Sequence, residues 1–161
     1  MTKIFNLLFK VALCIIVFSL FVNTVPFVKH VSAYLGDVAF SLGDTKQAVI
    51  GETSLVVEVA DTENARKKGL SGRSPLDTYE GLFFVFDTTG VNGIWMKDMN
   101  FPIDIIWFND HKEVVYIEQN VLPDSFPEVF GTSVNSKFVL EVPSGFVKVN
   151  RIKKGDLFTL L

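Results

Sequence analysis

The chain has 161 residues, of which 48% are hydrophobic and 13% aromatic, and its formal net charge is −3. This length allows one folded domain and an appendage. The only cysteine is Cys14, so the chain can form no internal disulfide and no thiolate zinc site.

The first 33 residues resemble a targeting segment. Lys3 and Lys10 precede the apolar run 11–22, and small residues lead up to Ala33, which favours an export signal cleaved after Ala33. The alternative is a membrane anchor over residues 4–28, which is long enough to span a bilayer. Both interpretations place the remaining chain outside the cytoplasm, as a secreted or membrane-anchored domain.

Charge argues against a nucleic-acid partner. Without residues 1–33 the chain keeps 12 basic and 18 acidic residues, a net charge of about −6. A net acidic domain is poorly suited to nucleic acid or to anionic lipid headgroups.

The next residues predict a linker, two strands and a helix. We interpret 34–52 as a linker that ends in a short strand at 47–50, and 53–161 as the folded domain. Residues 55–60 are rich in β-branched side chains and predict a strand. A short helix should follow, with Thr62 as its N-cap and Gly69 just past its end.

The stretch 93–108 holds both tryptophans and is the one around which the chain is organised. It follows a predicted strand at 81–86 and predicts two short strands joined by a corner near Pro102. In the second of these, apolar side chains occupy both alternating faces, which is typical of a central strand covered on each side.

The remainder predicts further strands. A turn at 109–112 should join the central strand to a strand at 113–118 as a hairpin, and 120–136 should be a long loop of the kind that often covers a site. Strands are expected at 137–142 and 157–161, with Ser144 capping a helical turn between them. The fold class is therefore mainly β: a compact antiparallel β-sandwich or open barrel with one or two short helices, preceded by an N-terminal hydrophobic helix.

The order of these segments resembles the DUF192 family of small bacterial and archaeal domains of unknown function. The resemblance covers 53–160 and rests on seven segments in order, among them Trp95-Met96-Lys97 and Gly155-Asp156. It implies a compact, mainly antiparallel β fold, often exported, and it implies no activity. The chain departs from the family pattern at Ser71, where a methionine is usual, and at Asp98 and Met99, where asparagine and threonine are usual.

Several charged side chains fall within apolar strands. Charge in such surroundings is paired with an opposite charge or faces a pocket. One interpretation is structural: Asp104 or Glu141 pairs with Arg73 or Lys97 and fixes loops to the sheet. The other is a cleft for a small ligand or an envelope protein. Its expected lining is Arg73, Trp95, Met96, Lys97, Asp98, Asp104 and Glu141.

Catalysis has few candidates. The only histidine after Ala33 is His111, so a catalytic triad, a Cys–His pair or a histidine-rich zinc site is excluded. No nucleotide-binding glycine pattern occurs, and we expect neither a cofactor nor a metal, a carboxylate-only metal site being the weakest option. The alternative to a binding module is a hydrolase or lyase that uses Asp104 and Glu141 as an acid–base pair on an envelope substrate.

Overall fold

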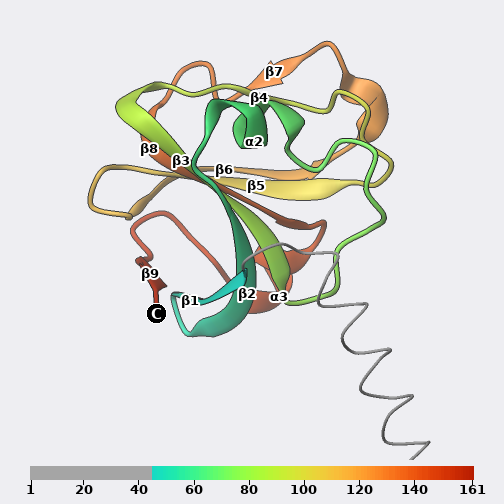
Figure 1. Ribbon diagram of the computed structural model, residues 1–161. Helices are drawn as coiled ribbons and strands as arrows, with labels where there is room; N and C mark the ends of the chain where they lie inside the picture. The colour runs from blue at the N-terminus through green and yellow to red at the C-terminus, as the bar shows by residue number, and fades with distance from the viewer. Residues whose placement is uncertain (1–44) are drawn as a thin grey trace, which may run out of the picture. The chain divides into compact units, whose positions relative to one another are not determined.

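A computed structural model describes residues 45–161 as a mainly β domain (Figure 1). The strands are β1 (Thr45–Ile50), β2 (Thr53–Ala60), β3 (Glu80–Val91), β4 (Ile94–Trp95), β5 (Ile103–Phe108), β6 (Val114–Val121), β7 (Val129–Phe130), β8 (Asn135–Pro143) and β9 (Phe158–Leu160). The helices are α2 (Glu63–Lys68), α3 (Phe146–Asn150) and the 3-10 turn η1 (Pro123–Ser125). The predicted N-terminal hydrophobic helix lies outside the described residues. No helix within 45–161 has the length and apolar character needed to cross a bilayer.

Seven strands form one curled sheet in the order β6-β5-β8-β3-β2-β1-β9, and β4 pairs with β7 in a small second sheet. The architecture is therefore a half-barrel rather than a sandwich of two full sheets. The edges of the curled sheet meet at one end, where Glu113 bridges to Leu157 and the Val114 amide donates to the Asp156 carbonyl at 2.9 Å.

One strand pair departs from the predicted antiparallel pattern. β2 and β3 are parallel, because the chain crosses from the end of β2 back to the start of β3 through α2. A parallel pair needs such a crossover, and its helix covers one face of the sheet. This crossover places α2 over the outer face of the sheet.

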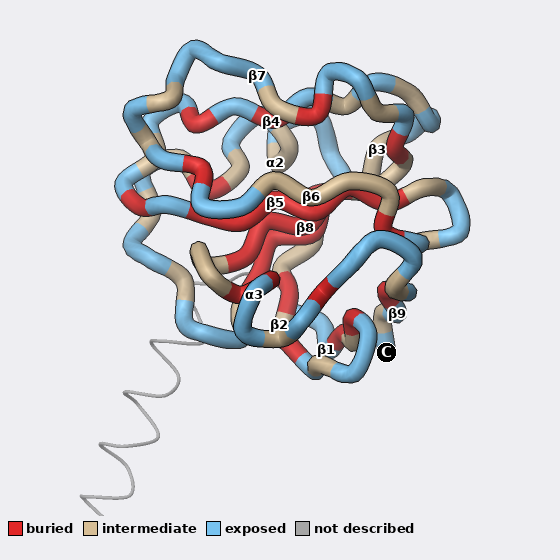
Figure 2. Tube along the Cα trace, turned by 180° about the vertical axis from the view of Figure 1, so that it is seen from behind, coloured by how far each residue is buried: buried red, intermediate tan, exposed pale blue. Residues whose placement is uncertain are grey.

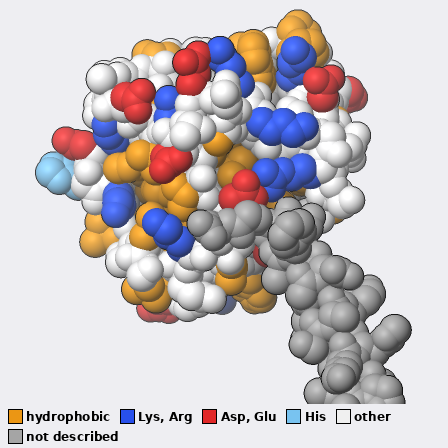
Figure 3. Space-filling view, viewed as in Figure 1, with side chains coloured by type: hydrophobic (Ala, Val, Ile, Leu, Met, Phe, Trp, Pro, Cys, Tyr) orange, Lys and Arg blue, Asp and Glu red, His pale blue; other side chains and the backbone are white. Residues whose placement is uncertain are grey.

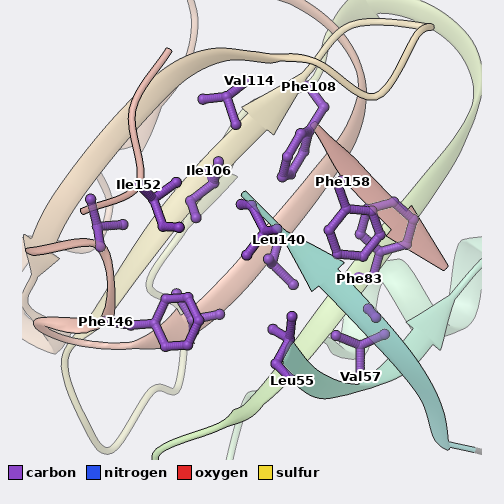
Figure 4. Packing of buried hydrophobic residues seen from close by; sticks show 14 residues of the cluster. Leu55, Val57, Phe83, Ile106, Phe108, Val114, Leu140, Phe146, Ile152 and Phe158 are labelled. Carbon is purple, nitrogen blue, oxygen red and sulfur yellow. The ribbon is translucent and has the colours of Figure 1, made fainter. Parts of the chain in front are cut away.

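The sheet separates two apolar clusters. β5 is buried at all six positions, which confirms the prediction of a central strand covered on both sides (Figure 2). Ile106 and Phe108 face the concave cluster, together with Phe83, Leu140 and other side chains drawn in Figure 4. Ile103, Ile105 and Trp107 face the outer cluster, beneath α2 and the small sheet. Each fully buried side chain of this size contributes about 1.5–3 kcal/mol to stability.

The two helix-capping predictions have different outcomes. Thr62 caps α2 as predicted, its hydroxyl oxygen accepting a hydrogen bond from the Ala65 amide at 3.1 Å. The prediction for Ser144 is wrong: the N-cap of α3 is Gly145, without a side-chain cap. The Ser144 hydroxyl instead donates to the Asn120 side chain at 2.8 Å.

The predicted loop 120–136 contains η1 and β7, which packs it against the sheet. Gly131 lies so close to Trp107 that an added Cβ would come within 2.4 Å of the indole. Its φ of 76° is also one that side chains disfavour. Glycine here lets the loop close over Trp107, whose indole N–H donates to the Asn92 carbonyl at 2.9 Å.

Candidate functional site

The pairing of the strands aligns three glutamates across the outer face of the sheet. Glu58 lies opposite Leu82, Leu82 opposite Glu141, Glu141 opposite Ile105, and Ile105 opposite Glu118. Directly opposed residues point to the same face. Glu141 is the middle member of this row, with an apolar side chain on each side.

Glu141 is a buried carboxyl without a full set of partners. The residue is 4% exposed, and within residues 45–161 its Oε2 has no hydrogen-bond partner. Burial raises the pKa of Glu141 to about 8, and the positive charge of Arg73 opposes this shift. The side chain is therefore a neutral carboxylic acid at pH 7, able both to donate and to accept a hydrogen bond.

Arg73 does not neutralise Glu141, because it is held by Glu58. Its guanidinium donates two hydrogen bonds to the Glu58 carboxylate, at 2.6 and 2.9 Å. This bidentate contact raises the pKa of Arg73, with burial acting against it. In the part of the chain that the structure describes, no ion pair within 4.0 Å involves Glu141.

A cavity of about 230 Å³ lies above Glu141, between the outer face of the sheet, α2 and β4. Six apolar side chains form most of its wall: Leu70, Phe84, Phe86, Ile94, Trp95 and Met99. Glu141 is the carboxyl at its base, and Ser71 and two glycines complete the lining on the loop side. A largely apolar hollow with a few polar groups is the usual form of a small-molecule site.

The α2 side of the cavity carries one acidic and three basic side chains. Arg66 is fixed by hydrogen bonds to the carbonyls of Asp61 and Val85 at 2.6 and 2.7 Å. Lys67 pairs with Glu63 at 2.7 Å. Lys68 also lines the cavity and, among residues 45–161, makes no ion pair. The helix therefore gives this side of the cavity a net positive charge.

Of the predicted site residues, Trp95 and Glu141 line the cavity. Trp95 is 52% exposed, whereas Met96, its neighbour, is 1% exposed and belongs to the outer core. Lys97 and Asp98 are exposed and act through their backbones. The Lys97 carbonyl accepts a hydrogen bond from the Ser71 hydroxyl at 2.8 Å, and the Asp98 carbonyl accepts one from the Gly72 amide at the same distance.

Two of the three departures from the family pattern, Asp98 and Ser71, have a structural meaning. Asp98 has a φ of 55°, and asparagine and aspartate are the side chains that best tolerate this left-handed conformation. The aspartate thus preserves the turn that an asparagine would make. Ser71 lines the cavity, so a serine in place of the usual methionine leaves more space beside α2.

Asp104 lies apart from this site. It pairs with Val142, one residue beyond Glu141, and therefore projects from the opposite face of the sheet. Its carboxylate accepts hydrogen bonds from the amides of Asn120 and Val147, at 2.8 and 2.9 Å. Asp104 thus fixes the start of α3 to the sheet. The structure does not bring Asp104 and Glu141 together.

Several lining residues were missed by the sequence analysis. They include the three basic side chains of α2, the pair Phe84 and Phe86 on β3, and Met99 in the corner before β5. The helix and strand were predicted, but not the parallel crossover that lays α2 across the outer face. The alternation of Leu82, Phe84 and Phe86 on that face was the signal available in the sequence.

Residues 45–161 offer no metal centre of the usual kind. No group of three His, Cys, Asp or Glu side chains in this range is arranged to hold an ion. On the face viewed in Figure 3, basic and acidic side chains are interspersed with hydrophobic ones. That face carries no broad patch of one charge.

Together the curled sheet and the cavity over Glu141 define a small, mainly β domain with a hollow on its outer face. The chain belongs to the DUF192 family, described as "Uncharacterized ACR", whose model matches residues 45–160. This confirms the resemblance found in the sequence. A search of curated proteins gave no match.

Two solved structures share the fold. A protein from Sinorhizobium meliloti 1021, described as a candidate transcription regulator, is 24% identical with a TM-score of 0.69; the match covers 73% of this chain and 94% of that one. A protein of unknown function from Novosphingobium aromaticivorans DSM 12444 is 28% identical with a TM-score of 0.64, covering 71% and 84%. These likenesses extend to the fold and assign no activity.

Proposed function

We propose that this domain is a small-ligand-binding module whose ligand enters the cavity beside α2 and meets Glu141 at its base. The observation that carries the proposal is the Glu141 carboxyl. The residue is buried and lines the cavity, and its shielded Oε2 has no hydrogen-bond partner among residues 45–161. A buried polar group of this kind costs about 1–3 kcal/mol of stability unless something satisfies it. A bound ligand with a hydrogen-bonding group would do so.

The volume of the cavity limits the size of the ligand that it can hold. An apolar cavity of about 150 Å³ accepts a benzene molecule, and sites for drug-sized ligands begin near about 300 Å³. A cavity of about 230 Å³ therefore suits a single ring with a short substituent. Trp95 stands at this cavity with half of its surface exposed, which suits a planar partner stacking on the indole.

The test is a fragment screen by ¹H–¹⁵N correlation spectra and thermal shift, using single-ring compounds with neutral, anionic and cationic substituents. We expect hits that shift the amides of residues 69–71 and 93–95. The occluding variant Ser71→Met should lose these hits, because its longer side chain fills the cavity. Lys148→Ala, a change on α3 remote from the lining, should keep them. A screen without any hit at these amides would refute the proposal.

The cellular setting is also a proposal. The basic start and apolar run of the first 33 residues support export, with the domain secreted or anchored through residues 4–28. A fusion of the full chain to a periplasmic reporter enzyme tests export, and N-terminal sequencing of the exported product distinguishes cleavage from anchoring. Reporter activity that appears only in the cytoplasm would contradict this setting.

A second candidate is the binding of an envelope protein. Three exposed apolar side chains adjoin one another: Trp95 pairs with Val129 across the small sheet, and the Trp95 and Phe126 rings meet edge to face at 6.2 Å. Exposed aromatic side chains of this kind are enriched at protein interfaces. The hydrolase alternative loses its main support, because Asp104 and Glu141 project from opposite faces of the sheet.

A further inference from the structure

We infer that the ligand of this cavity is a small aromatic anion, which places a neutral hydrogen-bonding group against Glu141 and its negative group beside the basic side chains of α2. The inference rests on the proposed function and names the chemical class that the site would select. Three regions of the lining carry it.

The inner end of the cavity favours a neutral polar group. Glu141 is flanked in the sheet by Leu82 and Ile105, both about 1% exposed or less. A cationic ligand group here would have to lose its hydration together with that of the carboxylate, and such double desolvation often exceeds the gain from pairing. A hydroxyl or amide needs no charge separation. It can accept a hydrogen bond from the carboxylic acid, or donate one to it, where Glu141 borders the cavity.

The middle of the cavity favours a flat apolar body. Phe84 and Phe86 stack with an interplanar angle of 13° and a centroid separation of 6.4 Å. Trp95 lines the same cavity from β4, and Met99 from the corner before β5. Rings and thioether groups make favourable contacts with an aromatic ligand. Trp95 contributes its exposed half at the solvent side.

The α2 side favours an anion. Arg66, Lys67 and Lys68 line it together with a single acid, Glu63. Glu63 is already paired with Lys67. Arg66 is held by two backbone carbonyls and pairs with the Asp87 carboxylate at 3.4 Å. Of the three basic side chains, Lys68 is the one that makes neither an ion pair nor a hydrogen bond to a backbone carbonyl within residues 45–161. Two of the three basic side chains therefore have an acidic partner, and the positive charge of Lys68 is the one that attracts a carboxylate and repels an amine.

The experiment compares four probes that share a ring and differ at their ends, with affinity measured by NMR titration of the cavity amides. The probes are 4-hydroxyphenylacetate, phenylacetate, tyrosol and tyramine. We expect 4-hydroxyphenylacetate to bind most tightly. Phenylacetate, which lacks the inner hydroxyl, should lose up to about tenfold. Tyrosol, with a neutral outer end, should also bind more weakly, and tyramine, with a cation there, should bind most weakly of the four.

Variants assign each end of the ligand. Lys68→Ala should weaken 4-hydroxyphenylacetate by about threefold or more and leave tyrosol unchanged, whereas Lys148→Ala should change neither. Glu141→Gln keeps a neutral hydrogen-bonding side chain and should retain most of the affinity for 4-hydroxyphenylacetate. Glu141→Leu removes the polar group and should reduce its affinity to that of phenylacetate. A ¹H–¹⁵N spectrum of each variant verifies that it is folded.

Two results would overturn the inference in distinguishable ways. If tyramine binds most tightly and Glu141→Gln abolishes its binding, the cavity is a cation site; the proposed function then stands and the ligand class is wrong. If other fragments bind the cavity while all four probes fail, the class is wrong in the same sense. If no probe and no fragment shifts the cavity amides, both the inference and the proposed function fail.

Discussion

The buried carboxyl of Glu141 should make the stability of the domain depend on pH in a direction opposite to that of a salt-bridged acid. In the folded state burial raises the pKa of Glu141 from 4.5 to about 8. As pH rises from 4.5, the unfolded chain loses this proton while the folded chain keeps it. The free energy of unfolding therefore falls through this window, and the stabilising contribution is fully present only below pH 4.5.

The size of this change in the free energy of unfolding follows from the difference between the two pKa values of Glu141. Each pH unit within it changes the free energy of unfolding by about 1.4 kcal/mol, so the whole window from 4.5 to about 8 is worth at most about 5 kcal/mol. Glu141→Gln has no carboxyl to ionise. The difference in stability between this variant and the natural chain should therefore grow in favour of the variant as pH rises from 5 to 8.

Urea unfolding at pH 5, 6, 7 and 8, followed by far-UV circular dichroism, measures this difference. Other titrating groups cancel in the comparison because both proteins carry them. Glu52→Gln, a change at an exposed turn residue, controls for the loss of one acid from the chain. A difference between natural chain and Glu141→Gln that does not change with pH would refute the assignment of a buried neutral acid.

Three further predictions concern the framework of the site. Gly131→Ala should destabilise the domain by roughly 2–4 kcal/mol, because its Cβ would overlap Trp107; an unchanged urea midpoint would contradict the packing described. Asp104→Ala should cost roughly 2–3 kcal/mol by leaving the buried Val147 amide without its acceptor, while fragment binding survives in the folded fraction. Trp95→Ala should change the free energy of unfolding by less than about 1 kcal/mol, since the side chain is half exposed. The same variant should bind aromatic fragments more weakly. A variant that is strongly destabilised but still binds these fragments fully would contradict the assignment of Trp95 to the binding site.

The sequence predicted much of the fold because periodicity and caps are local signals. The covered central strand at Ile103–Phe108, the Thr62 cap of α2 and the hairpin to β6 all depend on neighbouring residues. The parallel pairing of β2 with β3 does not, because it depends on how the chain returns after α2. A helix of six residues gives no indication in the sequence of which sheet face it will cover.

The site was harder to predict for the same reason. Glu141 was identified because a lone acid between apolar residues must be satisfied somehow, and Trp95 because it lies in the organising stretch. The sequence did not indicate which acid the loop residue Arg73 would contact, and in the structure Arg73 pairs with Glu58 instead of Glu141. The register sends Asp104 to the other face of the sheet. The sequence predicted the helix but not its position, and the parallel crossover places the basic side chains of α2 at the cavity.

The most direct test of the central claim is a methyl NMR titration with 4-hydroxyphenylacetate. Leu70, Ile94 and Met99 line the cavity, whereas Leu55 and Val147 lie in the concave cluster on the other side of the sheet. The account predicts saturable shifts of the Leu70, Ile94 and Met99 methyl groups, with Leu55 and Val147 unmoved. Shifts absent from the cavity methyl groups, or equal on both sides of the sheet, would contradict it.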